Sequence, residues 1–147
     1  MAVPLSRSQT QTTPFVPDTS ARWRFSRLSS PLGALLVQAI IDDRVLITPV
    51  VRMEILYSAR STAQYAEHDA RLAPLRMLRN GRAVADAAMR ALTDLSVRSD
   101  GYHRVSVTDA LIAAAAAEHD VAVLHRDAHF DRLAEVLAFD SVALPVP

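Results

Sequence analysis

The amino-acid sequence predicts a three-layer α/β domain with a short, mainly parallel central sheet flanked by helices. Short apolar runs alternate along the chain with longer segments whose apolar residues recur at helical spacing. Strands that helices cover on both faces have this short apolar character. Half of the 147 residues are hydrophobic and 22% are charged, which is the composition of one folded domain. Residues 1–13, rich in Ser, Thr and Gln, are expected to be a disordered leader, and residues 14–147 to form the domain.

The first half of the chain is expected to contain two strands and two helices. The strands are residues 15–21, which run into a turn, and residues 44–49, which are rich in β-branched side chains. Residues 29–43 begin with serines and a proline that suit a helix N-terminus. Thr48 and Pro49 then suit the N-cap and the first position of the second helix.

The second half is expected to be mostly helical, with two further strands. Asn80 and Gly81 separate two long amphipathic helices, and Gly101 ends the second of them. An alternation of helix and strand follows. The expected helices are 63–79, 82–99, 106–119 and 128–138, and the expected strands are 121–125 and 141–145.

The bulk composition excludes several classes of protein. The absence of cysteine excludes a disulfide scaffold, a thiolate nucleophile and a cysteine-ligated zinc site. The longest apolar stretches are shorter than the roughly 20 residues of a membrane-spanning helix, and the first residues lack the apolar segment of a secretory signal. A cytoplasmic protein without a membrane segment is therefore expected. The net charge of zero argues against a nonspecific nucleic-acid coat, although every basic residue is an arginine, whose planar fork suits phosphate.

Four acids occupy corresponding places in the predicted alternation of strands and helices. Asp18 follows the first strand, and Asp127 follows the strand at 121–125. Glu54 and Asp109 lie in the first halves of two helices. In parallel α/β sheets the functional crevice lies beyond the carboxyl ends of the strands, so the four carboxylates are expected to converge there. Carboxylate oxygens suit Mg²⁺ and Mn²⁺, and crowded negative charges themselves favour a bound cation.

Each acid also has an ordinary structural explanation. Asp18 suits the first position of a turn. Glu54 is compatible with a solvent-facing helix position. Asp109 matches a capping box that begins at Ser106, and acids favour helix N-termini. Asp127 suits the cap of the helix that follows it. Only the joint placement of the four acids favours a shared metal site.

Three motifs resemble those of the PIN domain family, specifically the bacterial VapC-type toxins. They are VPDTSA, RMEILYSAR and TDALIAAAAAEHDVAVLHRDAHFDRL, and the resemblance spans roughly residues 15–145. It implies that residues 14–147 form a single PIN-like nuclease domain. It also implies that Ser20 supports the first acid through its hydroxyl. By this likeness the catalytic, metal-binding acids are Asp18, Glu54, Asp109 and Asp127.

The same resemblance implies an activity and partners. VapC-type proteins are the toxins of type II toxin–antitoxin systems: Mg²⁺- or Mn²⁺-dependent endoribonucleases that cut structured RNA, either tRNA or ribosomal RNA, with a metal-activated water. They are usually homodimers, and a cognate VapB-type antitoxin silences them. Arg22 and Arg24 are expected to contact RNA phosphates. The helices within 63–95 are expected to expose apolar surface for a second copy or an antitoxin helix.

The chain departs from the common family pattern in the first and last motifs. Pro17 interrupts the first strand. His129 stands where some relatives carry a further acid. Asp131 is expected to face outward on the last helix. These departures bear on the tuning of the metal site.

Parts of the sequence are also compatible with three functions other than a ribonuclease. A catalytically degenerate PIN-fold module would bind RNA or protein and keep the acids for structure alone. If the HRDAH segment were extended, His125, Asp127 and His129 would point to one side as a transition-metal site. Asp18 as the covalent nucleophile of a phosphatase is disfavoured, because Ser20 stands where such enzymes need a second acid and the chain has no lysine.

Overall fold

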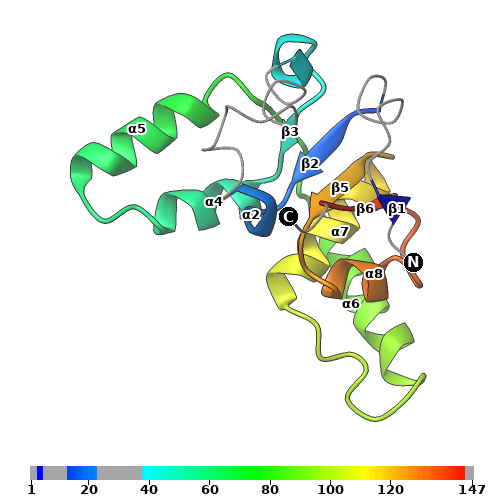
Figure 1. Cartoon of the computed structure of the whole chain (residues 1–147). Helices are drawn as coiled ribbons and strands as arrows, with labels where there is room; N and C mark the ends of the chain where they lie inside the picture. Colours follow the sequence, from blue (N-terminus) through cyan, green and yellow to red (C-terminus); the bar gives the residue numbers. More distant parts are fainter. Residues whose placement is uncertain (1–2, 5–12, 23–37, 145–147) are drawn as a thin grey trace.

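The computed structural model describes residues 3–4, 13–22 and 38–144 (Figure 1). Its strands are β1 (Val3–Pro4), β2 (Phe15–Pro17), β3 (Leu46–Ile47), β4 (Arg76–Met77), β5 (Ala122–His125) and β6 (Ser141–Ala143). Its helices are α2 (Thr19–Arg22), α4 (Pro49–Tyr57), α5 (Thr62–Leu72), α6 (Arg82–Ser96), α7 (Val107–Glu118) and α8 (His129–Leu133). The elements confirm the predicted α/β class, with a short parallel sheet flanked by helices.

The described strands all pair in parallel. Four of them form a sheet in the order β1-β6-β5-β2, and β3 pairs with β4. A bridge between Phe15 and Val45 joins the two groups. Because parallel strands run in the same direction, the segments that follow β2 and β5 begin at the same edge of the sheet. Asp18 and Asp127 lie in these two segments.

The alanine-rich helix α7 lies inside the core, in contact with α4, α6, α8 and β5 (Figure 1). Ala113, Ala114, Ala115 and Ala116 are fully buried. Their methyl side chains let the neighbouring elements approach closely, and this packing fixes the first turn of α7, which carries Asp109. Although α7 is apolar, none of the helices in the described residues is long and apolar enough to cross a membrane.

Two predicted helix starts are confirmed. Thr48 is the N-cap of α4, and its hydroxyl accepts the N–H of Val51 at 3.1 Å. Ser106 is the N-cap of α7, and its hydroxyl accepts the N–H of Asp109 at 3.4 Å. A side-chain oxygen at this position satisfies a backbone donor that the helix itself leaves unpaired.

The helix expected over 63–79 is shorter in the structure. In the structure α5 ends at Leu72, and Arg76–Met77 form strand β4. Pro74 accounts for the difference, because proline has no N–H for a helical hydrogen bond and its ring clashes with the preceding turn. The segment pairs with β3 instead, which places β4 at the edge of the two-stranded sheet.

Other expected segments also differ. Val3–Pro4, inside the expected disordered leader, form β1 and pair with β6, so the expectation is wrong for these two residues. The helix expected over 128–138 is shorter in the structure, where α8 ends at Leu133. Hydrogen bonds of the i→i+3 type follow it along the chain. Of the helix expected over 29–43, residues up to 37 lie outside the described part of the chain.

Candidate active site

Asp18 lies between β2 and α2, where the residues around it hold its backbone and its carboxylate. It is 2% exposed, and its N–H donates to the carbonyl of Leu124 in β5 at 2.8 Å. Ser20 donates twice to Asp18 Oδ2, from its N–H at 3.0 Å and its hydroxyl at 2.6 Å. The Ser20 oxygen also accepts the N–H of Arg126 at 3.0 Å. Asp18 is thereby attached to the segment that follows β5.

Glu54 approaches Asp18 from α4, and Thr19 lies between the two carboxylates. The Thr19 hydroxyl is 3.0 Å from Glu54 Oε2 and 3.5 Å from Asp18 Oδ1. A hydroxyl has one proton to donate, so the shorter contact assigns it to Glu54. Thr19 therefore turns the Glu54 carboxylate toward α2 and away from the solvent-facing position that a helix surface would give it.

Asp109 keeps its carboxylate free of the helix cap. In a full capping box, the acid three residues after the N-cap accepts the N–H of the N-cap residue. Here the N–H of Ser106 donates instead to Nδ1 of His129 at 3.1 Å. The carboxylate of Asp109, a residue that is 6% exposed, lies with Oδ2 3.3 Å from the same nitrogen. The capping-box explanation therefore accounts for the backbone of Asp109 but not for its side chain.

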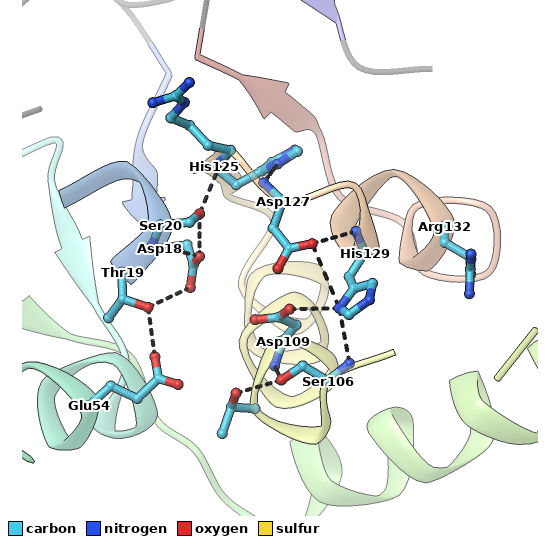
Figure 2. Close-up of polar contacts among 12 residues, drawn as sticks. Asp18, Thr19, Ser20, Glu54, Ser106, Asp109, His125, Asp127, His129 and Arg132 are labelled. Carbon is cyan, nitrogen blue, oxygen red and sulfur yellow. Dashed lines mark hydrogen bonds and ion pairs between the residues drawn. The ribbon is translucent and has the colours of Figure 1, made fainter. Parts of the chain in front are cut away.

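Asp127 lies between β5 and α8 and is held at two points. Its N–H donates to Nδ1 of His125 at 3.2 Å. Its Oδ1 accepts the N–H of His129, the first residue of α8, at 2.9 Å. This bond uses one oxygen of the carboxylate, and Figure 2 shows the carboxylate turned toward Asp109.

The four acids form one group, here called the acidic cluster: Asp18, Glu54, Asp109 and Asp127 (Figure 2). Burial is the main cause that raises the pKa of Asp109, from 3.8 to about 8. The negative charges of Asp18, Asp127 and Glu54 add to this effect. Because two charged carboxylates at short range repel each other, one of the acids keeps its proton near neutral pH unless a cation is present.

The donor atoms of this site fit a divalent cation. Among the described residues, Asp109, Asp127 and His129 each offer one atom, and these three atoms lie within 4.8 Å of one another. Mg²⁺ binds one or two carboxylates and keeps several waters, and Mn²⁺ accepts carboxylate and imidazole ligands. Asp18, directly before α2, and Glu54, in α4, face this group (Figure 2).

The HRDAH segment does not form the alternating site that an extended chain would give. The nitrogens of His125 contact the N–H of Asp127 and the hydroxyl of Ser141. Burial lowers the pKa of His125, which is 1% exposed. Helix α8 begins at His129, the last residue of this segment, so His129 faces the acidic cluster while His125 points into the core.

Two further expectations concern surface positions. Asp131 does not simply face outward: its Oδ1 accepts the hydroxyl of Ser141 at 3.0 Å, and its side chain is 37% exposed. The expected RNA contacts remain predictions. Arg22 ends α2, but its side chain lies outside the described residues, as does all of Arg24.

The sequence patterns did not identify Thr19 or the contacts of His129 with the acidic cluster. A threonine or a histidine at a helix start is common without any function, so neither residue stood out. One available signal was the position of His129, two residues after an acid at the start of a predicted helix. Its ring contacts Asp109, which is 20 residues earlier in the chain.

A model of the PIN domain family matches residues 15–136. The chain belongs to the PIN domain family. It is 30% identical over 125 residues to Ribonuclease VapC17 of Mycobacterium tuberculosis, covering 84% of this chain and 90% of that protein. It is 32% identical over 123 residues to Ribonuclease VapC18 of the same species, covering 83% and 88%. This PIN-domain protein is therefore homologous to VapC-type ribonucleases.

The fold of this PIN domain also matches solved structures. One is the member of the VapBC family of toxin–antitoxin systems named VapBC-5, from Mycobacterium tuberculosis. The TM-score is 0.62 at 26% sequence identity, and the match covers 92% of this chain and all of that chain. The similarity therefore extends over almost the whole of this chain.

Proposed function

We propose that this protein is the toxin of a VapBC-type toxin–antitoxin pair and acts as a divalent-metal-dependent endoribonuclease. The observation that carries the proposal is the acidic cluster, in which the Asp109 carboxylate is buried among like charges and is not used by its helix cap. Crowded carboxylates destabilise a metal-free fold, so they are hard to explain by structure alone. The identity to two proteins named as VapC ribonucleases supports the same activity.

Asp109 and Asp127 would hold Mg²⁺ or Mn²⁺, with His129 beside them. Asp18 and Glu54 would face the ion from the segment before α2 and from α4. When bound, the ion lowers the pKa of a water molecule and offsets negative charge on the scissile phosphodiester. Thr19 and Ser20 orient the carboxylates of the other two acids through their hydroxyl groups. In this way the chain presents carboxylates from four separate segments to one position.

Structured RNA, either tRNA or ribosomal RNA, is the proposed substrate. Because water is the attacking group, the products carry a 5′-phosphate and a 3′-hydroxyl. Attack by the ribose 2′-hydroxyl would leave a 2′,3′-cyclic phosphate instead. The net charge of zero provides no general attraction for RNA. Recognition is therefore assigned to RNA shape and to local arginines, with Arg22 and Arg24 as candidates for phosphate contacts.

The proposed partners are a VapB-type antitoxin and a second copy of this chain. The solved structure named VapBC-5 belongs to a toxin–antitoxin family, which supports the first partner. Large apolar side chains are exposed on α4, α5 and α6: Met53, Tyr57, Tyr65 and Met89. Exposed apolar side chains of this size favour a covered surface in the assembled protein. A cytoplasmic location, where RNA substrates are found, is part of the same proposal.

Cleavage of total tRNA and ribosomal RNA by the purified, antitoxin-free protein tests the activity. The reactions contain Mg²⁺, Mn²⁺ or EDTA, and the Asp109→Asn variant is run beside the wild type. Asp94→Asn, which removes an exposed carboxylate from α6, is the matched control. With Mg²⁺ or Mn²⁺, the wild type and Asp94→Asn are expected to produce fragments with 5′-phosphate ends. No fragments are expected from Asp109→Asn, or from any of the proteins in EDTA. A folded wild type that cuts no RNA with either metal would favour the degenerate binding module.

A further inference from the structure

His125, the last residue of β5, is a fully buried histidine with hydrogen-bonding groups at both ring nitrogens. Nδ1 lies 3.2 Å from the backbone nitrogen of Asp127, and Nε2 lies 2.7 Å from the hydroxyl oxygen of Ser141. The ring also packs against Phe130, with ring centroids 4.9 Å apart. Packing alone would be served by an apolar side chain, so the two polar contacts need their own explanation.

The hydroxyl of Ser141 determines which nitrogen of His125 carries the proton. Ser141 donates to Oδ1 of Asp131 at 3.0 Å, and this bond uses its only proton. Its oxygen must then accept from His125, so the proton of the neutral ring is on Nε2. Nδ1 keeps a lone pair, which is the acceptor that the N–H of Asp127 requires. The other tautomer would set two N–H donors against each other at 3.2 Å.

We propose that His125 is a positioning residue of the metal site: its Nε2–H tautomer, set by Ser141 and Asp131, holds the backbone of Asp127 through Nδ1. This inference rests on the proposed function, because it assigns a role toward the same acidic cluster. His125 touches neither substrate nor metal in this scheme. It acts only through Asp127.

Fixing the backbone of Asp127 also fixes the direction of its carboxylate. Oδ1 of Asp127 accepts the N–H of His129, so the residue is fixed at its own N–H and at one side-chain oxygen. With both points fixed, the carboxylate is directed toward Asp109 across the site (Figure 2). Loss of the bond to His125 would free the first point and leave the segment after β5 less constrained. Hydrogen bonds of this kind orient ligands and affect metal affinity.

Two substitutions of His125 separate positioning from packing. In His125→Asn, the side-chain oxygen takes the place of Nδ1 and still accepts the N–H of Asp127. In His125→Gln, the amide reaches the place of Nε2, near Ser141, but provides no acceptor at the place of Nδ1. Both variants remove the ring that packs on Phe130, so similar losses of stability are expected, and thermal unfolding checks this.

The first readouts use the metal-free protein. A long-range ¹H–¹⁵N NMR spectrum of the wild type is expected to show the Nε2–H tautomer of His125. Hydrogen exchange of the Asp127 amide is expected to stay slow in His125→Asn. In His125→Gln it should become about tenfold faster, the effect of losing one ordinary hydrogen bond. A proton on Nδ1, or equal exchange in the two variants, would overturn the inference.

The second readout is Mn²⁺ affinity, measured by titration calorimetry. His125→Gln is expected to weaken binding by about 10-fold or more, whereas His125→Asn keeps most of the affinity. Equal Mn²⁺ affinities of the two variants would overturn the inference even if the wild type cuts RNA. If the wild type binds Mn²⁺ and cuts no RNA, the proposed ribonuclease activity fails, and a difference between the variants still supports the role of His125.

Discussion

Asp109→Asn is expected to stabilise the metal-free protein near neutral pH, although it should abolish RNA cleavage. Burial and the charges of the other three acids raise the pKa of Asp109 from 3.8 to about 8 in the folded protein. Between pH 3.8 and about pH 8, Asp109 keeps its proton in the folded state but has released it in the unfolded state. The free energy of unfolding therefore falls as the pH rises through this window. The stabilising contribution is fully present below pH 3.8 and is lost above about pH 8.

The size of the effect follows from one titrating proton. Such a group changes the free energy of unfolding by about 1.4 kcal/mol per pH unit, or roughly 3 kcal/mol between pH 5 and pH 7. Asparagine has no charge to bury and does not contribute this pH dependence. The difference in stability between the variant and the wild type should therefore grow with pH up to about pH 8 and then level off.

Urea unfolding in EDTA, at several values between about pH 5 and pH 8, measures this difference. Groups that titrate in both proteins cancel when the wild type is subtracted from the variant. Asp94→Asn, on the exposed face of α6, should follow the wild type at every pH. A stability difference between Asp109→Asn and the wild type that does not change with pH would refute the reasoning, because the pKa of Asp109 would then not be raised in the folded protein.

Three other outcomes are expected. Mn²⁺ affinity of the wild type should rise about tenfold per pH unit below about pH 8, because the ion competes with one proton on Asp109; calorimetry that shows no pH dependence would contradict this. Ser20→Ala removes the 2.6 Å hydroxyl bond to Asp18 and should weaken Mn²⁺ binding about 10-fold, whereas Ser20→Thr, which keeps a hydroxyl, should bind nearly as well as the wild type. Thr48→Ala removes the cap on the N–H of Val51 and should lower the free energy of unfolding by about 1 kcal/mol in urea; Thr48→Ser should be nearly neutral, and equal losses in the two variants would argue against the cap.

Local patterns were sufficient for most of the fold. Thr48 and Ser106 cap the helices they were expected to cap, and α7 is as buried as its alanine run indicates. The helix predicted over 63–79 is longer than the one observed. Pro74 is a local signal that the helix ends early, but the pairing of residues 76–77 with β3 depends on a distant segment. Strand β1 could not be foreseen, because a strand of two residues depends on a partner at the other end of the chain.

The sequence by itself determined which acids were candidates, because their places follow from the order of strands and helices. Only the tertiary structure decided what each carboxylate does. Ser106 could have closed a capping box with Asp109, but its N–H donates to His129, 23 residues later, and this leaves the carboxylate to the acidic cluster. His125 likewise faces Ser141 rather than a metal. The physical reason is the same for each: a hydrogen-bonding group has few protons and lone pairs, and the packing of distant segments determines which partner takes them.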